Sequence, residues 1–468
     1  MSSVTLTVNG LRVSVPEGST LLEAALAAGI GVPTLCHMKG YPHQSACGVC
    51  FVEAGPGRLA PSCSCPAEEG LQVMTVSMAA LQARKAAVEL LLSEHSGDCR
   101  APCSRACPAG LDVMGTVRLF ESGNARGALA LTLETLPFPG LMAVSCAGYC
   151  ERVCRRAGLD AAIDIRGAHA AADQAATDHE RAAMIASAAP SGSPVLIRGA
   201  GPAALSAAFF LRRAGRLVAV IGDPMETLRR APEYTGNTAA ALEREIGILR
   251  LSGCRFFTGA AADAPMGEAA RAGSPGALLE LDSGPEEWRI PAKAIARGRQ
   301  AALALLAGAP APAPEAMQRP FESVITNITG EELRSLDSGV ERASGGGRCL
   351  ACGCAREHDC RLRMAAQASG ADRRRFPGGR IPVRRGRFRL GRSALVFEPG
   401  KCIRCGACVR LSARTACPLS FMGRGFTVEP GGFELYCRPE CAPVFRQIAA
   451  ACPTGCLSWE DGKEDTNE

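Results

Sequence analysis

The stretch from residue 36 to residue 50 reads CHMKGYPHQSACGVC. Ten residues separate Cys36 from a Cys-x-x-Cys pair, Cys47 and Cys50, and Cys63 follows at a distance. The close pair of thiolates can bind one iron while the loop folds back to supply the other ligands. The spacing therefore predicts a site for one iron–sulfur cluster, with a zinc site as the alternative.

The residues before this loop predict a hairpin and a helix. Residues 4–8 and 11–15 alternate apolar and polar side chains around an Asn-Gly pair, which is a strong hairpin signal. Thr20 is placed to cap an Ala/Leu helix over residues 21–28. A hairpin, a helix and a cysteine-rich loop in this order resemble the β-grasp [2Fe–2S] domain that begins the large iron–sulfur subunit of complex I and iron-only hydrogenases. The resemblance implies one [2Fe–2S] cluster.

Composition agrees with a metal-rich protein of several domains. The chain has 468 residues, enough for roughly three to four domains. Its 24 cysteines occur in tight runs, which suit metal centres better than disulfides across long loops. The net charge of the whole chain is only +6, which does not indicate nucleic-acid binding. No apolar run approaches the roughly 20 residues of a membrane helix, and the N-terminus lacks a basic-then-apolar leader. We therefore expect a cytoplasmic protein without membrane insertion.

Two cysteine triplets lie in a second, mostly helical stretch, residues 78–185. Six cysteines in two triplets indicate two [4Fe–4S] clusters. The stretch resembles the N-terminal helical domain shared by the small subunit of glutamate synthase and dihydropyrimidine dehydrogenase. The sequences that carry the resemblance are CPAGLD from Cys107, LPFPG from Leu136, CERVCRR from Cys150 and AIDIRGAH from Ala162.

This resemblance implies that the two triplets interleave between the clusters. One cluster would take Cys107, Cys146 and Cys150. The family places a non-cysteine ligand on the following helix, and His169 matches that position. A structural histidine is the alternative.

The other cluster would take Cys99, Cys103 and Cys154, and it lacks an upstream cysteine that the family has. His95 stands four residues before Cys99. The complex I subunit has a His-x-x-x-Cys ligand pair in the matching place, so His95 is the candidate for the missing ligand. Imidazole ligation would raise the potential relative to four thiolates. Here too a structural role is the alternative.

A glycine-rich turn marks a third kind of module. A buried-strand run, residues 195–197, enters GAGPAA from Gly199 and leaves into a helix over residues 203–213. Gly199 and Gly201 permit a tight turn near a pyrophosphate, and Ala204 is the small third residue. The sequence of this turn resembles the start of the FAD domain in glutamate synthase-like proteins.

This module departs from that family. Gly222 stands where an acidic residue should bind the ribose, and Asp223 comes one place late. A second glycine fingerprint for NAD(P)H is missing from the sequence, and the usual span is cut to about a third. We interpret the module as a structural remnant, with retained FAD as the alternative, and expect no NAD(P)H binding.

A fourth cysteine run has four thiols within twelve residues: Cys349, Cys352, Cys354 and Cys360. Such a run binds something tetrahedral, and a [4Fe–4S] cluster, zinc and free thiols are the alternatives. The surrounding segment, Arg342 to Arg392, carries fourteen arginines and few acidic residues. It could dock an acidic partner or serve as a solvated connector.

The last cysteine module resembles a bacterial ferredoxin. KCIRCGACVR supplies Cys402, Cys405 and Cys408, and CPTGC supplies the remote Cys452, which together predict one [4Fe–4S] cluster. Ser412 replaces the cysteine that would serve a second cluster. The remaining cysteines leave a further cluster open: Cys417, Cys437, Cys441 and Cys456.

The predicted fold class is multidomain α+β. We predict a β-grasp [2Fe–2S] ferredoxin domain (1–80), an α-helical domain with two [4Fe–4S] clusters (81–190), a truncated Rossmann-like α/β domain (191–310), an Ala/Pro linker with a Cys/Arg-rich segment (311–395) and a ferredoxin-like [4Fe–4S] domain (396–468). Together these modules would hold one [2Fe–2S] cluster and at least three [4Fe–4S] clusters.

The sequence contains no pattern typical of a catalytic acid, base or nucleophile. The leading interpretation is an electron-transfer subunit that relays electrons between partner subunits of a larger oxidoreductase, such as a hydrogenase, a formate dehydrogenase-like enzyme or a flavin-dependent reductase. The alternatives are a self-sufficient flavoprotein that oxidises NAD(P)H and a redox-sensing scaffold.

Overall fold

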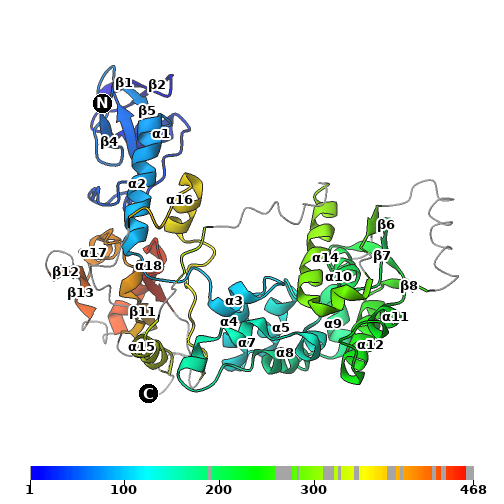
Figure 1. Ribbon diagram of the computed structural model, residues 1–468. Coiled ribbons are helices and arrows are strands. Elements are labelled where there is room, and N and C mark those ends of the chain that lie inside the picture. Colours follow the sequence, from blue (N-terminus) through cyan, green and yellow to red (C-terminus); the bar gives the residue numbers. More distant parts are fainter. Residues whose placement is uncertain are drawn as a thin grey trace. The chain divides into compact units, whose positions relative to one another are not determined.

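The computed structural model in Figure 1 describes residues 2–186, 191–258, 277–281, 284–308, 321–324, 328–341, 347–376, 386–390, 394–423, 428–433 and 439–459. The chain divides into two compact units. The first comprises Met1–Arg100, Pro320–Gly345 and Cys352–Glu468, and the second comprises Ala101–Arg319 and Gly346–Ala351. The predicted segment 311–395 is therefore shared between both units.

A five-stranded sheet of order β2-β1-β5-β3-β4 begins the first unit. Its strands are β1 (Ser3–Val8), β2 (Leu11–Pro16), β3 (Phe51–Ala54), β4 (Leu59–Pro61) and β5 (Gln72–Met74). The predicted hairpin is confirmed, and Asn9 and Gly10 both have the positive φ that its two-residue turn requires. The predicted helix is α1 (Leu21–Ala27), which begins with a capping box between Thr20 and Glu23.

The first unit continues with a long helix and a second, smaller sheet. Helix α2 (Met78–Glu94) packs against α16 (Arg361–Ser369). A three-stranded antiparallel sheet is formed by β10 (Phe388–Arg389), β11 (Leu395–Phe397) and β14 (Leu457–Trp459). The remaining elements are α15 (Gly330–Glu341), α17 (Ala407–Ser412), β12 (Ser420–Met422), β13 (Glu429–Gly431) and α18 (Ala442–Ala451).

The second unit joins a group of short helices to an α/β layer. The helices are α3 (Pro102–Ala106), α4 (Val113–Glu121), α5 (Ala125–Leu133), α6 (Pro139–Ser145), α7 (Tyr149–Arg152), α8 (Ile165–Asp173) and α9 (Asp178–Ile185). A parallel sheet of order β8-β7-β6-β9 follows. Its strands are β6 (Ser191–Arg198), β7 (Arg216–Ile221), β8 (Arg255–Phe257) and β9 (Leu278–Glu280). The predicted strand and helix around the glycine turn are confirmed as β6 and α10 (Pro202–Arg213).

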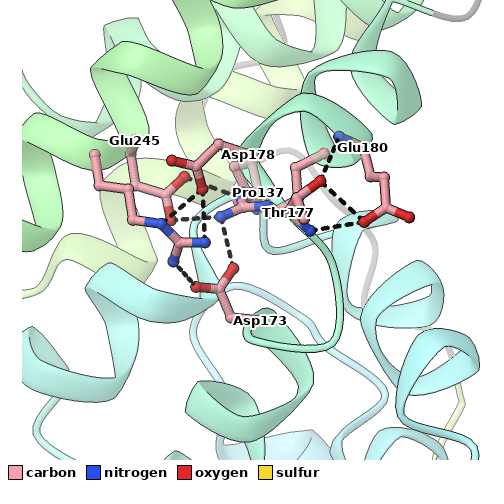
Figure 2. A network of polar contacts seen from close by, with 8 residues as sticks. Pro137, Asp173, Thr177, Asp178, Glu180 and Glu245 are labelled. Atoms are coloured by element: carbon pink, nitrogen blue, oxygen red, sulfur yellow. Dashed lines mark hydrogen bonds and ion pairs between the residues drawn. The ribbon is translucent and has the colours of Figure 1, made fainter.

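The two parts of the second unit share one hydrophobic core and one buried ion-pair network. The α/β layer also contains α11 (Pro224–Arg229), α12 (Gly236–Leu251) and α14 (Pro291–Leu306). Arg181 on α9 donates to Asp173 on α8 at 2.6 Å and to Glu245 on α12 at 2.9 Å (Figure 2). Arg244 pairs with Asp173 from the other side. Because Arg181 is only 1% exposed, these charges stabilise the fold only as a set.

Burial affects the titration of this network. It raises the pKa of Glu245 to about 7, although the neighbouring Arg181 opposes the shift. The α/β layer is thus held to the short helices by a network in which the charge of Glu245 depends on pH near neutrality.

Candidate metal centres

The N-terminal cysteine loop brings its four predicted ligands together. Cys36, Cys47, Cys50 and Cys63 are each at most 4% exposed. The Cys36 thiol hydrogen-bonds those of Cys47 and Cys63, and Cys63 also hydrogen-bonds Cys50. Four buried thiols joined by these three contacts fit a compact [2Fe–2S] cluster, whose irons they would bind.

A glycine allows this loop to sit close to the first long helix. Gly48, between the paired cysteines, has φ +64°. A Cβ atom there would stand 3.0 Å from Cβ of Ala87 on α2, so only glycine suits both the backbone and the space. Cys65 belongs to no cluster predicted from the cysteine spacing. It lies outside the set of four and packs against the sheet core.

The C-terminal cysteines line one pocket. Its walls include the four predicted ligands and one further cysteine: Cys402, Cys405, Cys408, Cys452 and Cys456. The amide of Arg404 donates to Sγ of Cys402 at 3.4 Å, and that of Leu457 donates to Sγ of Cys452 at 3.5 Å. A hydrogen bond from Cys456, helped by backbone amides, lowers the pKa of Cys452 to about 5. Burial raises the pKa of Cys405 to about 12 and also raises that of Cys408, so ionisation of these two thiols would depend on the iron of a bound [4Fe–4S] cluster.

Sequence reasoning did not place Cys456 in this pocket. The available signal was its position four residues after Cys452 in the same CPTGC stretch. Of the other cysteines left unassigned, Cys417 and Cys441 form a disulfide. Cys437 lies outside the described residues.

The N-terminal and C-terminal cysteine loops contact each other within the first unit. Arg410 on α17 donates through Nη2 to the carbonyl of Cys36 and, at 3.3 Å, to that of Cys405. Its Nη1 donates to the carbonyl of Pro42 at 2.8 Å. Arg361 binds the same N-terminal loop through the carbonyl of Leu35 at 2.8 Å. Two predicted cluster sites that are distant in sequence are therefore neighbours.

In the second unit, Cys107, Cys146 and Cys150 lie within electrostatic range of one another. The backbone amides of residues 109–111 hydrogen-bond the Cys107 thiol. Burial raises the pKa of Cys150 to about 12, and the other two thiols add to the shift. Arg166 donates to the carbonyl of Cys146 at 3.3 Å. Three thiols with amide donors fit the predicted cluster.

The two predicted histidine ligands are both buried. His95 directly follows α2 and is 7% exposed, and His169 on α8 is 5% exposed. Burial lowers the pKa of each to about 4, which keeps both imidazoles neutral at pH 7. Neither Nδ1 atom has a hydrogen-bond partner among the described residues. Neutral buried imidazoles with an unpaired nitrogen fit the predicted ligand role.

The remaining predicted set spans the boundary between the two units. Cys99 belongs to the first unit, whereas Cys103 and Cys154 belong to the second. The fourth run is divided in the same way, since Cys349 belongs to the second unit and Cys354 to the first. No three His, Cys, Asp or Glu side chains in the described part of the chain converge tightly enough for a single metal ion. The thiolates of a cluster bind different irons and therefore stand further apart.

At the glycine turn, the residues do not fit a dinucleotide. Oε2 of Glu287 accepts a hydrogen bond from the amide of Ala203 at 3.2 Å, at the start of α10. The same carboxylate pairs with Arg297 and lies directly against Gly201. A helix N-terminus of this kind is where a pyrophosphate would bind. Here the chain's own carboxylate takes that place.

Many arginines of the fourth segment contact their own unit. Arg363 donates to the carbonyl of Phe321, Arg373 to that of Val324, and Arg375 pairs with Glu89 at 2.8 Å. Parts of the segment, residues 342–346, 377–385 and 391–393, lie outside the described residues. Across the described ranges no helix is both long and apolar enough to cross a membrane.

Two protein-family models match the chain. The 2Fe-2S iron-sulfur cluster binding domain matches residues 1–78, and dihydropyrimidine dehydrogenase domain II, 4Fe-4S cluster, matches residues 78–181. The chain is 45% identical over 105 residues to the NADP-reducing hydrogenase subunit HndD of Solidesulfovibrio fructosivorans, covering 21% of this chain and 18% of that protein.

Two other relatives are also similar to part of the chain. Identity is 38% over 132 residues with the NADPH-Fe(3+) oxidoreductase subunit alpha of Geobacter sulfurreducens, covering 28% of this chain and 15% of that protein. Identity is 32% over 113 residues with the NAD-reducing hydrogenase HoxS subunit gamma of Cupriavidus necator, covering 24% of this chain and 47% of that protein. The chain thus spans less than half the length of these relatives. It is a multidomain iron–sulfur protein with a [2Fe–2S] domain followed by a [4Fe–4S] domain, related to subunits of hydrogenases and NAD(P)H oxidoreductases.

Proposed function

We propose that this chain is an electron-transfer subunit that relays electrons between redox partners of a larger oxidoreductase complex. The observation that carries the proposal is the contact between the N-terminal and C-terminal cysteine loops through Arg410. Iron–sulfur clusters bound at these thiolates would supply one-electron chemistry. The protein's part is to fix their spacing, exclude water and donate amide hydrogen bonds to sulfur.

The proposed ligands follow the thiols that lie together. Cys36, Cys47, Cys50 and Cys63 would hold the [2Fe–2S] cluster. Two [4Fe–4S] clusters would be held by Cys402, Cys405, Cys408 and Cys452, and by Cys107, Cys146, Cys150 and His169. The electron donor and acceptor would be the redox partners of this complex. The proposal includes a cytoplasmic location.

The flavoprotein alternative is disfavoured by Glu287. Its carboxylate occupies the phosphate position at α10, and it is held there by Arg297. Binding of FAD would require that ion pair to open and two negative groups to share one site.

The proposal is tested on the anaerobically purified full chain, by measuring iron, sulfide, zinc and flavin and by recording EPR spectra after reduction. We expect at least about 10 irons per chain, from the one [2Fe–2S] and two [4Fe–4S] clusters assigned above, and no flavin. The signals of the two neighbouring sites should be magnetically coupled. Stoichiometric FAD, or iron below about 6 with several zinc ions, would overturn the proposal.

A further inference from the structure

The fourth cysteine run lies where the chain passes from the second unit back to the first, between Ala351 and Cys352. The chain also crosses between the units between Arg100 and Ala101, one residue after Cys99. Both of these crossings have cysteines on either side. A run divided in this way cannot be read as one local site from its spacing alone.

Two thiols of the run lie with Cys99 in the first unit. The amide of Cys354 donates to the carbonyl of Cys99 at 3.3 Å. The Cys360 thiol is within electrostatic range of both the Cys354 and the Cys99 thiols. The amide of Ser323 donates to Sγ of Cys99 at 3.2 Å, as backbone amides do to metal-bound thiolates. All three cysteines are less than 9% exposed.

The C-terminal cysteine loop is shaped to admit this group. Sγ of Cys354 lies 3.5 Å from the carbonyl oxygen of Thr454. A Cβ atom at Gly455 would stand 3.0 Å from the same sulfur, so the glycine of CPTGC leaves the room that Cys354 occupies. Lys401, 3% exposed, is within electrostatic range of Cys354 and hydrogen-bonds His95 through its backbone. The predicted ligand His95 is therefore beside this group.

The first thiol of the run lies instead in the second unit. The Cys349 thiol is within electrostatic range of Cys154. Its backbone is held by Glu121 on α4, which accepts from the Cys349 amide at 3.2 Å. Helix α3, which carries Cys103, packs against α7, which directly precedes Cys154.

We propose that the Cys349–Cys360 run is not a metal site of its own but supplies thiolates to two [4Fe–4S] sites, Cys354 and Cys360 joining Cys99 in the first unit and Cys349 joining Cys103 and Cys154 in the second. This inference rests on the proposed function only for the nature of the metal group. It adds two [4Fe–4S] clusters to those assigned above, raises the expected iron from about 10 to about 18 per chain, and places the cluster at Cys99 beside the C-terminal one.

Double substitutions separate this arrangement from a local site. In the anaerobic full chain, Cys99→Ala and Cys354→Ala should each remove about four irons, and the double variant should remove no more than either. Combining Cys349→Ala with Cys354→Ala should remove about eight. A local Cys349–Cys360 cluster requires the reverse pattern, about eight irons for the first pair and about four for the second, and that result would overturn the proposal.

Cys65→Ala, outside every proposed site, is the matched control and should lose no iron. If the ligand variants do not fold, mild oxidation of the metal-free wild type and peptide mass mapping give an independent measurement. Crosslinks of Cys99 to Cys354 and of Cys154 to Cys349 support the proposal, whereas Cys349 crosslinked to Cys354 or Cys360 contradicts it. An iron content below about 6 in the wild type would instead overturn the proposed function.

Discussion

The N-terminal cysteine loop and the glycine turn before α10 both retain the local geometry of a cofactor motif, but they differ in what faces the motif. Around Cys36 the predicted ligands interact with one another. At Gly201 the backbone turn and the helix are intact, yet Glu287 fills the ligand position. A motif can therefore outlast its cofactor when its backbone has a packing role, whereas a set of thiols has little use without metal.

The largest effect is expected in the N-terminal loop. Cys50→Ala should remove the [2Fe–2S] cluster and about two irons per chain, because the buried site has lost one of four thiolates. Iron analysis and the loss of the [2Fe–2S] EPR signal measure this. Full iron content and an unchanged signal in Cys50→Ala would contradict the assignment of a [2Fe–2S] cluster to the N-terminal loop.

On the other side, the α/β layer should act as a support for the cluster-binding helices. Arg181→Ala should cost about 3–5 kcal/mol of unfolding free energy, because it leaves the carboxylate of Glu245 buried without its partner and that of Asp173 with Arg244 alone. Anaerobic denaturation monitored by circular dichroism measures this. Arg126→Ala, which removes an exposed ion pair with Glu180, is the control and should cost less than about 1 kcal/mol.

The same network predicts a pH dependence. The ordinary pKa of a glutamic acid is 4.5, and that of folded Glu245 is about 7, so the folded chain binds this proton more tightly. Its contribution to stability is complete below pH 4.5 and is lost as the pH rises through 7, by about 3 kcal/mol at most. As the pH rises from 5 to 8, the denaturation midpoint of the wild type should decrease relative to that of Glu245→Gln. A difference that stays constant would exclude this titration.

A glycine pair tests whether the glycine-turn region is kept for packing. Gly298 on α14 lies against the backbone of Ala203 on α10, so Gly298→Ala should destabilise the protein by about 1–3 kcal/mol. Gly247 on α12 has open space around its Cα, so Gly247→Ala should stabilise the helix by up to about 1 kcal/mol. Melting temperatures of the two variants should move in opposite directions.

The smallest effect is expected from the carboxylate in the phosphate position. Glu287→Gln should cost about 1–2 kcal/mol, because Arg297 loses a charged partner while the amide of Ala203 keeps an acceptor. Wild type should not bind FAD in a fluorescence titration. Tight FAD binding by the wild type would remove the contrast between the two regions.

Short-range signals in the sequence determined much of the fold. The hairpin around Asn9-Gly10, the capping box at Thr20 and the strand–turn–helix at Gly199 all depend on residues a few positions apart. Of the four predicted ligands, Cys36, Cys47 and Cys50 were predictable for the same reason, since they share one loop, whereas Cys63 follows the next two strands. Local geometry restricts such residues before any tertiary contact forms.

Only the tertiary structure decided which distant groups meet. Cys99 lies beside Cys354, Arg410 joins the two terminal cysteine loops, and Glu287 reaches the turn at Gly201. The spacing of the fourth run suggested one local site, and the boundary between the two units falls within that run. Contacts across such long loops depend on the packing of whole elements, and because the entropy of closing a loop grows only slowly with its length, sequence distance does little to select one partner over another.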